Sequence, residues 1–166
     1  LQGGTFCAED GYADPYMVAM GFANAARRLG VCIEEQTRVT GVQIQGGRIA
    51  GVETSRGSIS TPVVVNVAGA WGAEVARMAG IELPIRPFRR QVFVTESFES
   101  IPKPVPMILD MDPAFYFRGE GPGVLMGMSD PDEPSSFATH IDYAFLEQVV
   151  EHAIHRAPIL EDAEIR

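Results

Sequence analysis

The chain has 166 residues, of which 46% are hydrophobic, and it carries a formal net charge of −9. This length and apolar content predict one globular domain, or two interleaved lobes, with a sizeable core. The negative charge argues against a nucleic-acid partner, because no basic stripe is present to bind phosphates. No apolar run approaches the ~20 residues that a membrane-spanning helix needs, so we expect no membrane span.

The two cysteines, Cys7 and Cys32, have no metal-ligand spacing between them and are interpreted as free thiols. Free thiols are typical of a reducing compartment, and the amino terminus has no signal-peptide pattern. We therefore predict a cytoplasmic protein. The sequence starts at Leu1 rather than at a methionine, so we expect it to be cut from a longer protein.

The first predicted element is a helix over residues 15–29. Asp14 can cap its first turn, and Pro15 stands at the first helical position, where a missing N–H costs nothing. Gly30 supplies the left-handed residue that ends many helices. The apolar residues of this segment recur at helical spacing and therefore fall on one face of the helix. They are Val18, Phe22, Ala25, Ala26 and Leu29.

Short strands follow this helix. A strand over residues 31–34 leads into a three-stranded antiparallel meander between Val39 and Ser60. The dipeptides Gly46-Gly47 and Arg56-Gly57 separate the apolar runs of the meander. Glycine accepts the positive φ that tight hairpin turns require, so we place the turns at these two dipeptides.

Residues 63–68 form an uninterrupted apolar run that is typical of a parallel strand covered on both faces. We predict a buried parallel strand here. The turn after it, Ala68-Gly69-Ala70-Trp71, lies at the carboxyl end of that strand, where ligands bind in open α/β sheets. Glycine in such a turn lets the backbone approach a bulky ligand closely. Trp71 opens a predicted helix over residues 71–79, and its ring suits ligand contact and helix packing equally well.

The second half of the chain mixes strands, a loop and a helix. We predict a long strand over residues 87–96, an irregular proline-rich loop over residues 97–113 and a hairpin of residues 114–118 and 124–128. An amphipathic helix over residues 141–156 follows, and a proline stops it. The fold class that we predict from these elements is α/β, in a mixed α+β arrangement.

Two other patterns have simpler interpretations. The glycine-rich segment of residues 119–123 joins two strands, so no helix amino terminus is available there to bind a phosphate. His152 and His155 lie three apart on one helix face, but no cysteine or carboxylate completes a metal site. We therefore predict no metal.

Tyr116 and Arg118 alternate with Phe115 and Phe117 on one predicted strand. Alternation places the two phenylalanines on the core face of the sheet and the phenol and guanidinium on the other face. That pair can receive a small carboxylate, which the guanidinium would hold. On spacing alone, an ordinary half-exposed strand with a solvated arginine is the simpler interpretation.

Several segments, read in order and at this spacing, carry a resemblance to a known family. They are Gly11-Tyr12-Ala13-Asp14-Pro15, Leu29-Gly30-Val31, Thr37-Arg38-Val39-Thr40-Gly41-Val42, Asn66-Val67-Ala68-Gly69-Ala70-Trp71, Leu83-Pro84-Ile85-Arg86-Pro87, Arg89-Arg90-Gln91, Tyr116-Phe117-Arg118 and Val124-Leu125-Met126-Gly127. Together they resemble the FAD-dependent amine oxidoreductases of the D-amino-acid oxidase superfamily, of the sarcosine oxidase, glycine oxidase and dimethylglycine dehydrogenase type. The resemblance covers nearly the whole chain.

The resemblance implies a two-lobed flavoprotein that binds FAD. Residues 1–30 and 83–166 would belong to a substrate lobe with a mixed sheet and flanking helices. Residues 31–82 would supply the meander and the buried strand of the FAD-binding lobe. By the same resemblance, the cofactor-binding positions are Val39, through its backbone at the adenine end of FAD, and Ala68, Gly69 and Trp71 in the turn.

The same resemblance implies that Tyr116 lines the amine pocket, and with it we assign Arg118 to the substrate. The expected reaction is oxidation of the carbon–nitrogen bond of a small amino acid or N-methyl amino acid, by hydride transfer to the flavin. The resulting imine is hydrolysed by water. No catalytic residue is assigned, and additional subunits in the full enzyme stay open.

Two features of the family are absent from this sequence. Members begin with a GxGxxG turn and an acidic residue for the ribose, and they end with a further FAD-contacting segment. The resemblance therefore implies the middle of such an enzyme, which we expect to be inactive and to bind FAD weakly by itself.

Two other functions compete with this hypothesis. One is a non-catalytic small-molecule binding module that kept only the substrate lobe. The other is a flavoenzyme of the glycerol-3-phosphate dehydrogenase type. Against it, Arg118 is the single well-placed cation near Tyr116, and a phosphate substrate would usually need more than one cation.

Overall fold

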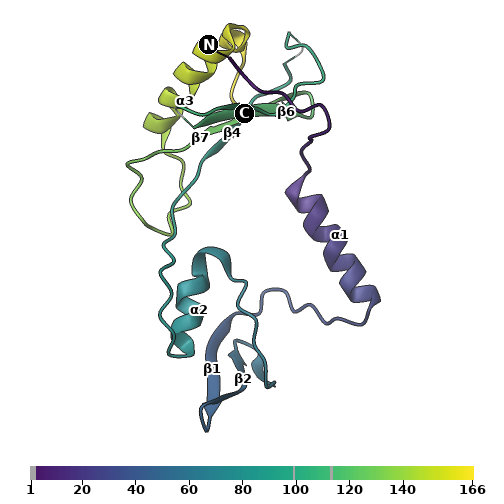
Figure 1. The fold of residues 1–166 in the computed structure, drawn as a ribbon, viewed down its shortest axis with the longest axis vertical. Helices are drawn as coiled ribbons and strands as arrows, with labels where there is room; N and C mark the ends of the chain where they lie inside the picture. The colour runs from purple at the N-terminus through teal and green to yellow at the C-terminus, as the bar shows by residue number, and fades with distance from the viewer. Residues whose placement is uncertain (1–2, 99, 113) are drawn as a thin grey trace. The chain divides into compact units, whose positions relative to one another are not determined.

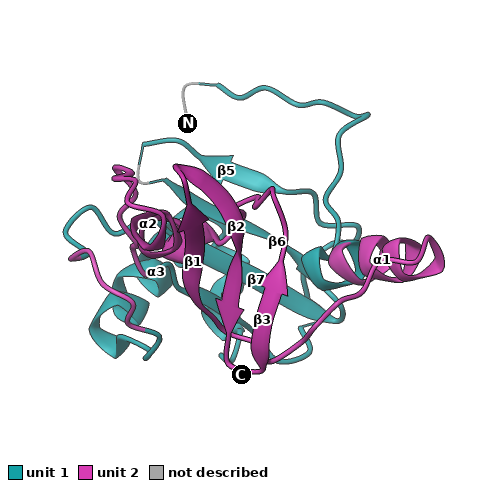
Figure 2. Cartoon of the chain, turned by 90° about the horizontal axis from the view of Figure 1, so that it is seen from below, with its two compact units in different colours: residues 1–18, 90–133, 139–166 teal, residues 19–89, 134–138 magenta. Residues whose placement is uncertain are grey.

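The computed structural model of the chain describes residues 3–98, 100–112 and 114–166. Contacts between residues divide the chain into two compact units (Figure 2). The first unit comprises residues 1–18, 90–133 and 139–166, and the second comprises residues 19–89 and 134–138. The second unit thus takes in residues 19–30 and 83–89, beyond the predicted range of 31–82. The assignment of lobes to substrate and cofactor stays a prediction.

The first unit is built on a four-stranded antiparallel sheet with one long helix against it (Figure 1). The strands are β4 (Val92–Val94), β5 (Ile108–Asp110), β6 (Phe115–Glu120) and β7 (Gly123–Met128), in the order β4-β7-β6-β5. The helix α3 (Tyr143–Arg156) packs against β6 and β7 and is followed by a 3-10 helix, Pro158–Asp162. The predicted hairpin is confirmed, with Gly123 pairing with Glu120 at the turn end.

The core of this unit lies between the sheet and α3. Phe115 and Phe117 are only 1% and 2% exposed. Tyr116 and Arg118, which alternate with them along β6, are half-buried. The predicted alternation along β6 is therefore confirmed. The core also contains Val124, Met126, Phe145 and Val149.

Both ends of α3 are held by side chains. At its start, the Asp142 carboxylate accepts hydrogen bonds from the backbone N–H groups of Ala144 and Phe145, at 3.1 and 3.4 Å. Such a cap satisfies amides that have no partner inside the helix. At its end, Arg156 forms an ion pair with Asp110 of β5. The helix is thereby tied to the sheet that presents Arg118.

The second unit contains the predicted meander, which is confirmed, although its second turn is Ser55-Arg56 rather than Arg56-Gly57. Its strands β1 (Val39–Gln45), β2 (Arg48–Thr54) and β3 (Gly57–Ser60) pair antiparallel in chain order. Gly46 and Gly47 join β1 to β2 with φ of 57° and 75°, a conformation that residues with a side chain rarely adopt. A 3-10 helix, Gly69–Trp71, leads into α2 (Gly72–Met78), which packs against β1.

The helix α1 (Pro15–Arg28) begins and ends as predicted. The Asp14 carboxylate accepts a hydrogen bond of 2.8 Å from the backbone N–H of Met17, and Gly30 has a φ of 86°. The apolar face of α1 is not covered in this structure: α1 has no buried residue, and Phe22 is 75% exposed. Periodicity identifies which face of a helix is apolar, but it does not say what covers that face.

Two predicted strands are wrong. The run of residues 63–68 forms no strand, and Val63, Val65 and Val67 are all exposed. Residues 31–34 form no strand either. A strand exists through hydrogen bonds to a neighbour, and none of the described strands pairs with either segment, so an apolar run alone does not make one.

Two other predicted boundaries shift. The long strand of residues 87–96 is shorter, because only Val92–Val94 belongs to the sheet, with isolated bridges at Phe88 and Thr95. The proline-rich segment of residues 97–113, expected to be irregular, contains the edge strand β5. Among the described residues, no helix has the length and apolar character to cross a bilayer.

Candidate functional site

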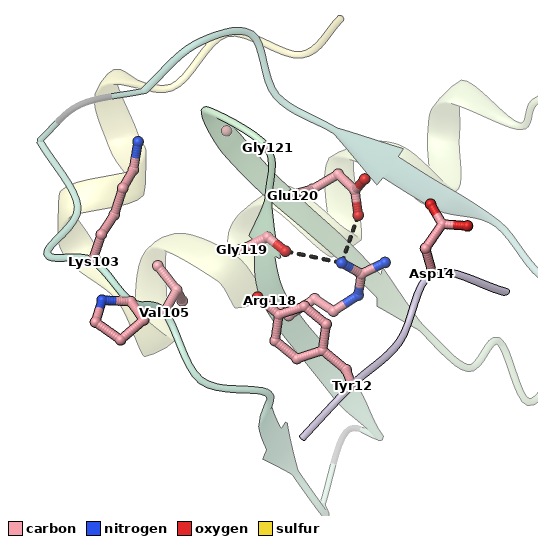
Figure 3. A pocket seen from close by; sticks show the side chains of 10 residues that line it. Tyr12, Asp14, Lys103, Val105, Arg118, Gly119, Glu120 and Gly121 are labelled. Atoms are coloured by element: carbon pink, nitrogen blue, oxygen red, sulfur yellow. Dashed lines mark hydrogen bonds and ion pairs between the residues drawn. The ribbon is translucent and has the colours of Figure 1, made fainter. Parts of the chain in front are cut away.

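A pocket of about 300 Å³ opens in the first unit beside the end of β6 (Figure 3). Three segments line it: Tyr12 and Asp14 ahead of α1, residues 103–105 in the loop before β5, and the β6–β7 hairpin with Arg118 and Glu120. The sheet thus provides a rigid wall, while residues distant in sequence complete the pocket. Such a pocket, with a few converging polar groups, is a candidate binding site.

Arg118 is the most strongly held side chain of this pocket. Its Nη1 forms an ion pair of 2.5 Å with the Glu120 carboxylate and donates a hydrogen bond of 2.9 Å to the carbonyl oxygen of Gly119. Its guanidinium also lies over the ring of Tyr12, with Cζ 4.7 Å from the ring centroid. The Arg118 side chain is only 15% exposed, so these contacts fix a largely desolvated cation.

The remaining donors of Arg118 decide what it can do. Among the described residues, no hydrogen bond uses its Nε or Nη2. A guanidinium presents these two nitrogens along one edge, in the geometry that a carboxylate accepts with both oxygens. Arg118 can therefore bind an external carboxylate while it stays paired with Glu120.

The charges around the pocket are balanced. Lys103 and Arg118 supply two cations, and Asp14 and Glu120 supply two carboxylates. The Lys103 ammonium donates to the carbonyl oxygen of Pro122 at 3.2 Å. This balance suits a small zwitterion better than a phosphate, which would need uncompensated positive charge.

Tyr116, the other predicted substrate residue, lies elsewhere on the same sheet face. It is not part of the pocket lining, and its ring lies over Gly127, its cross-strand partner on β7. A Cβ at Gly127 would lie 2.6 Å from the Tyr116 hydroxyl, so only glycine leaves room for the ring in this position. The structure thus pairs Arg118 with Tyr12 rather than with Tyr116, and contact between Tyr116 and a substrate stays a prediction.

Sequence reasoning missed Tyr12 and Glu120 as neighbours of Arg118. Tyr12 belongs to one of the segments that carried the resemblance, but no local pattern links it to a strand so far along the chain. Glu120 was two residues from Arg118 on the same strand, and this spacing alone could have suggested the ion pair.

The predicted cofactor residues lie in the second unit, on adjoining elements. Val39 begins β1, and the turn of Ala68, Gly69 and Trp71 leads into α2, which packs against that strand. The turn is rigid, because the Asn66 side chain donates to the Gly72 carbonyl at 2.8 Å and accepts from the Ala68 N–H at 3.2 Å.

The turn presents surfaces that a ring system can contact. Gly69 has a φ of 53°, and a Cβ built there would meet no atom within 4 Å. Trp71 is 54% exposed although it stacks on Phe137, with ring centroids 5.4 Å apart. The uncovered backbone at Gly69 and the accessible indole of Trp71 are suited to contact with the rings or sugars of a dinucleotide such as FAD. The role of these four residues stays a prediction.

Other reactive groups give no sign of a site. A hydrogen bond from the Cys32 thiol to the Glu34 carboxylate, together with the negative charge of that carboxylate, raises the pKa of Cys32. The thiol therefore stays protonated at neutral pH and is a poor nucleophile. Within the part of the chain that the structure describes, no three His, Cys, Asp or Glu side chains form a group that could hold a metal ion.

Comparison with known proteins identifies relatives along the whole chain. The family described as FAD dependent oxidoreductase matches residues 1–166. The chain is 33% identical to the mitochondrial sarcosine dehydrogenase of Homo sapiens, over 100% of this chain and 20% of that protein. It is 32% identical to sarcosine oxidase subunit beta of Rhizobium meliloti, over 99% of this chain and 39% of that protein.

Among solved structures, the crystal structure of L-proline dehydrogenase from P. horikoshii is similar, with a TM-score of 0.84 and 29% identity. The similarity covers 93% of this chain and 42% of that chain. The chain therefore spans 20% to 42% of the length of these relatives.

Proposed function

The chain belongs to the family of FAD dependent oxidoreductases, and from this we propose that it forms the part of such an enzyme that receives a small amino acid or N-methyl amino acid. The enzyme oxidises the carbon–nitrogen bond of this substrate. FAD, when bound, supplies the chemistry by accepting a hydride from the substrate carbon. The family predicted from the sequence is thereby confirmed, whereas the substrate and the reaction of the whole enzyme are our proposal.

The observation that carries the proposal is Arg118, which lines the pocket and whose Nε and Nη2 make no hydrogen bond among the described residues. These two nitrogens bind the carboxylate of the substrate through two hydrogen bonds, which fixes the orientation of the α-carbon as well as its position. The low exposure of the side chain, 15%, strengthens this interaction, because little water competes for the charges. Tyr116, on the same strand but outside the pocket lining, stays in the proposal as a second substrate residue.

The names of the relatives support this substrate class. Sarcosine dehydrogenase, sarcosine oxidase subunit beta and L-proline dehydrogenase all name small amino acids with a secondary amine. Such molecules offer one carboxylate and little else for recognition. A single bidentate arginine therefore accounts for much of the discrimination between an amino acid and a plain amine.

For FAD, the accessible turn of Ala68, Gly69 and Trp71 and the start of β1 at Val39 are the residues that would contact it. We keep additional subunits as part of the proposal, because one relative is named as a subunit. The cytoplasm stays our proposed location, supported by two exposed free cysteines, which are typical of a reducing compartment.

The proposal is tested by a substrate panel with the full-length gene product and an electron-accepting dye. We expect turnover with one or more of sarcosine, dimethylglycine, glycine and proline, and none with dimethylamine, which lacks the carboxylate. Turnover of glycerol 3-phosphate with none of the amino acids would support the alternative flavoenzyme. Absence of turnover with every compound would favour the binding module.

A further inference from the structure

The side chain of Tyr12 contacts two consecutive residues of β6, Arg118 and Gly119. Its ring faces the Arg118 guanidinium at 4.7 Å (Figure 3). The Tyr12 hydroxyl lies near Gly119, and a Cβ built on Gly119 would be 3.3 Å from the hydroxyl oxygen. A Cβ at Gly119 would be a tight contact, and the Tyr12 hydroxyl would have to shift by a few tenths of an ångström to relieve it.

A free arginine side chain has many conformations, and holding it in one conformation costs rotamer entropy. In this pocket, Glu120 and the Gly119 carbonyl fix the Nη1 end of the guanidinium. The Tyr12 ring, whose centroid lies 4.7 Å from the Arg118 Cζ, is a further contact that restrains the guanidinium, and it comes from a separate segment of the chain.

We propose that Tyr12 is a positioning residue for Arg118: its ring contacts the guanidinium and restrains it, so that Nε and Nη2 stay available to the substrate carboxylate. The inference rests on the proposed function of Arg118 and adds to it a residue from a separate segment of the chain. The attraction between a cation and an aromatic face supplies the physical basis. The restraint depends on the aromatic face and not on the hydroxyl, because the cation is attracted by the quadrupole of the ring.

The experiment uses the FAD-loaded full-length gene product and five variants: Tyr12→Leu, Tyr12→Gln, Tyr12→Phe, Arg118→Ala and the double variant Tyr12→Leu/Arg118→Ala. Two quantities are measured: the KM and kcat for the best substrate of the panel, and the Kd of acetate by calorimetry. Acetate carries the carboxylate but no amine, so it reports on the anion site alone. Tyr12 is 49% exposed, and Tyr12→Gln removes the ring without leaving an apolar side chain in water.

We expect Tyr12→Leu and Tyr12→Gln to raise both the KM and the acetate Kd by about threefold to thirtyfold, with kcat changed less than twofold. Tyr12→Phe keeps both constants within about twofold of the wild-type values. In the Arg118→Ala background, Tyr12→Leu has no further effect, because the group that it positions is gone.

Each other outcome decides against the inference. If Arg118→Ala raises the KM and the acetate Kd but loss of the ring does not, Tyr12 positions nothing and the proposed function still stands. If Tyr12→Phe is as impaired as Tyr12→Leu, the hydroxyl is responsible and the inference is wrong. If Arg118→Ala leaves both constants unchanged, the proposed function fails, and the inference fails with it.

Discussion

We expect the replacement of Arg118 by alanine to raise the KM of the full-length gene product for the proposed amino-acid substrate by about 30-fold to 1,000-fold. This range corresponds to the loss of one partner from a largely buried charged hydrogen bond. The guanidinium is 15% exposed, and its Nε and Nη2 make no hydrogen bond among the described residues, so the substrate carboxylate would lose its main partner. Steady-state kinetics over a wide substrate range measures the change.

Two further variants make this prediction specific. Arg118→Lys keeps the charge but cannot offer two parallel N–H groups, so we expect it to recover only a small part of the loss. Arg48→Ala removes an exposed cation from the second unit and serves as the control, with an expected change in KM of less than about twofold. An Arg118→Ala enzyme with an unchanged KM would mean that the carboxylate binds elsewhere.

The largest effect on stability is expected from Phe117→Ala. Phe117 is 2% exposed and belongs to the cluster between the sheet and α3, so its removal leaves a cavity in the core of the first unit. Phenylalanine-to-alanine changes at such positions cost about 3–5 kcal/mol of unfolding free energy. Urea unfolding of the full-length protein measures the cost as a lower midpoint at an unchanged slope.

Leu109→Ala is the matched control for this prediction. Leu109 of β5 pairs with Tyr116 of the neighbouring strand β6 but is 61% exposed, so its loss removes little buried surface. We expect a change within about 1 kcal/mol. Equal destabilisation by Phe117→Ala and Leu109→Ala would contradict the assignment of the core face of the sheet.

Sequence patterns correctly predicted the features that depend on a few neighbouring residues, such as helix ends, strand faces and a hairpin turn. The start and end of α1 followed from Asp14, Pro15 and Gly30, because capping and left-handed backbone depend on a few consecutive residues. The faces of β6 followed from alternation, because successive side chains on a strand point in opposite directions. The hairpin turn of the meander at Gly46-Gly47 followed for the same kind of reason.

Features that depend on a partner were harder to predict. The apolar run of residues 63–68 has the composition of a buried strand, but no described strand pairs with it, and its valines are exposed. Likewise, the surroundings of Arg118 depend on Tyr12, which reaches β6 only through the tertiary fold. Sequence spacing identified the arginine, and the structure identified what holds it.

The central claim is tested most directly by the visible spectrum of the full-length gene product, recorded before and after anaerobic addition of sarcosine, dimethylglycine, glycine or proline. We predict a flavin absorption band that bleaches when one of these amino acids is added, because oxidation of the substrate reduces the bound cofactor. A colourless protein that takes up no FAD, or a flavin band that none of the four compounds bleaches, would contradict the claim.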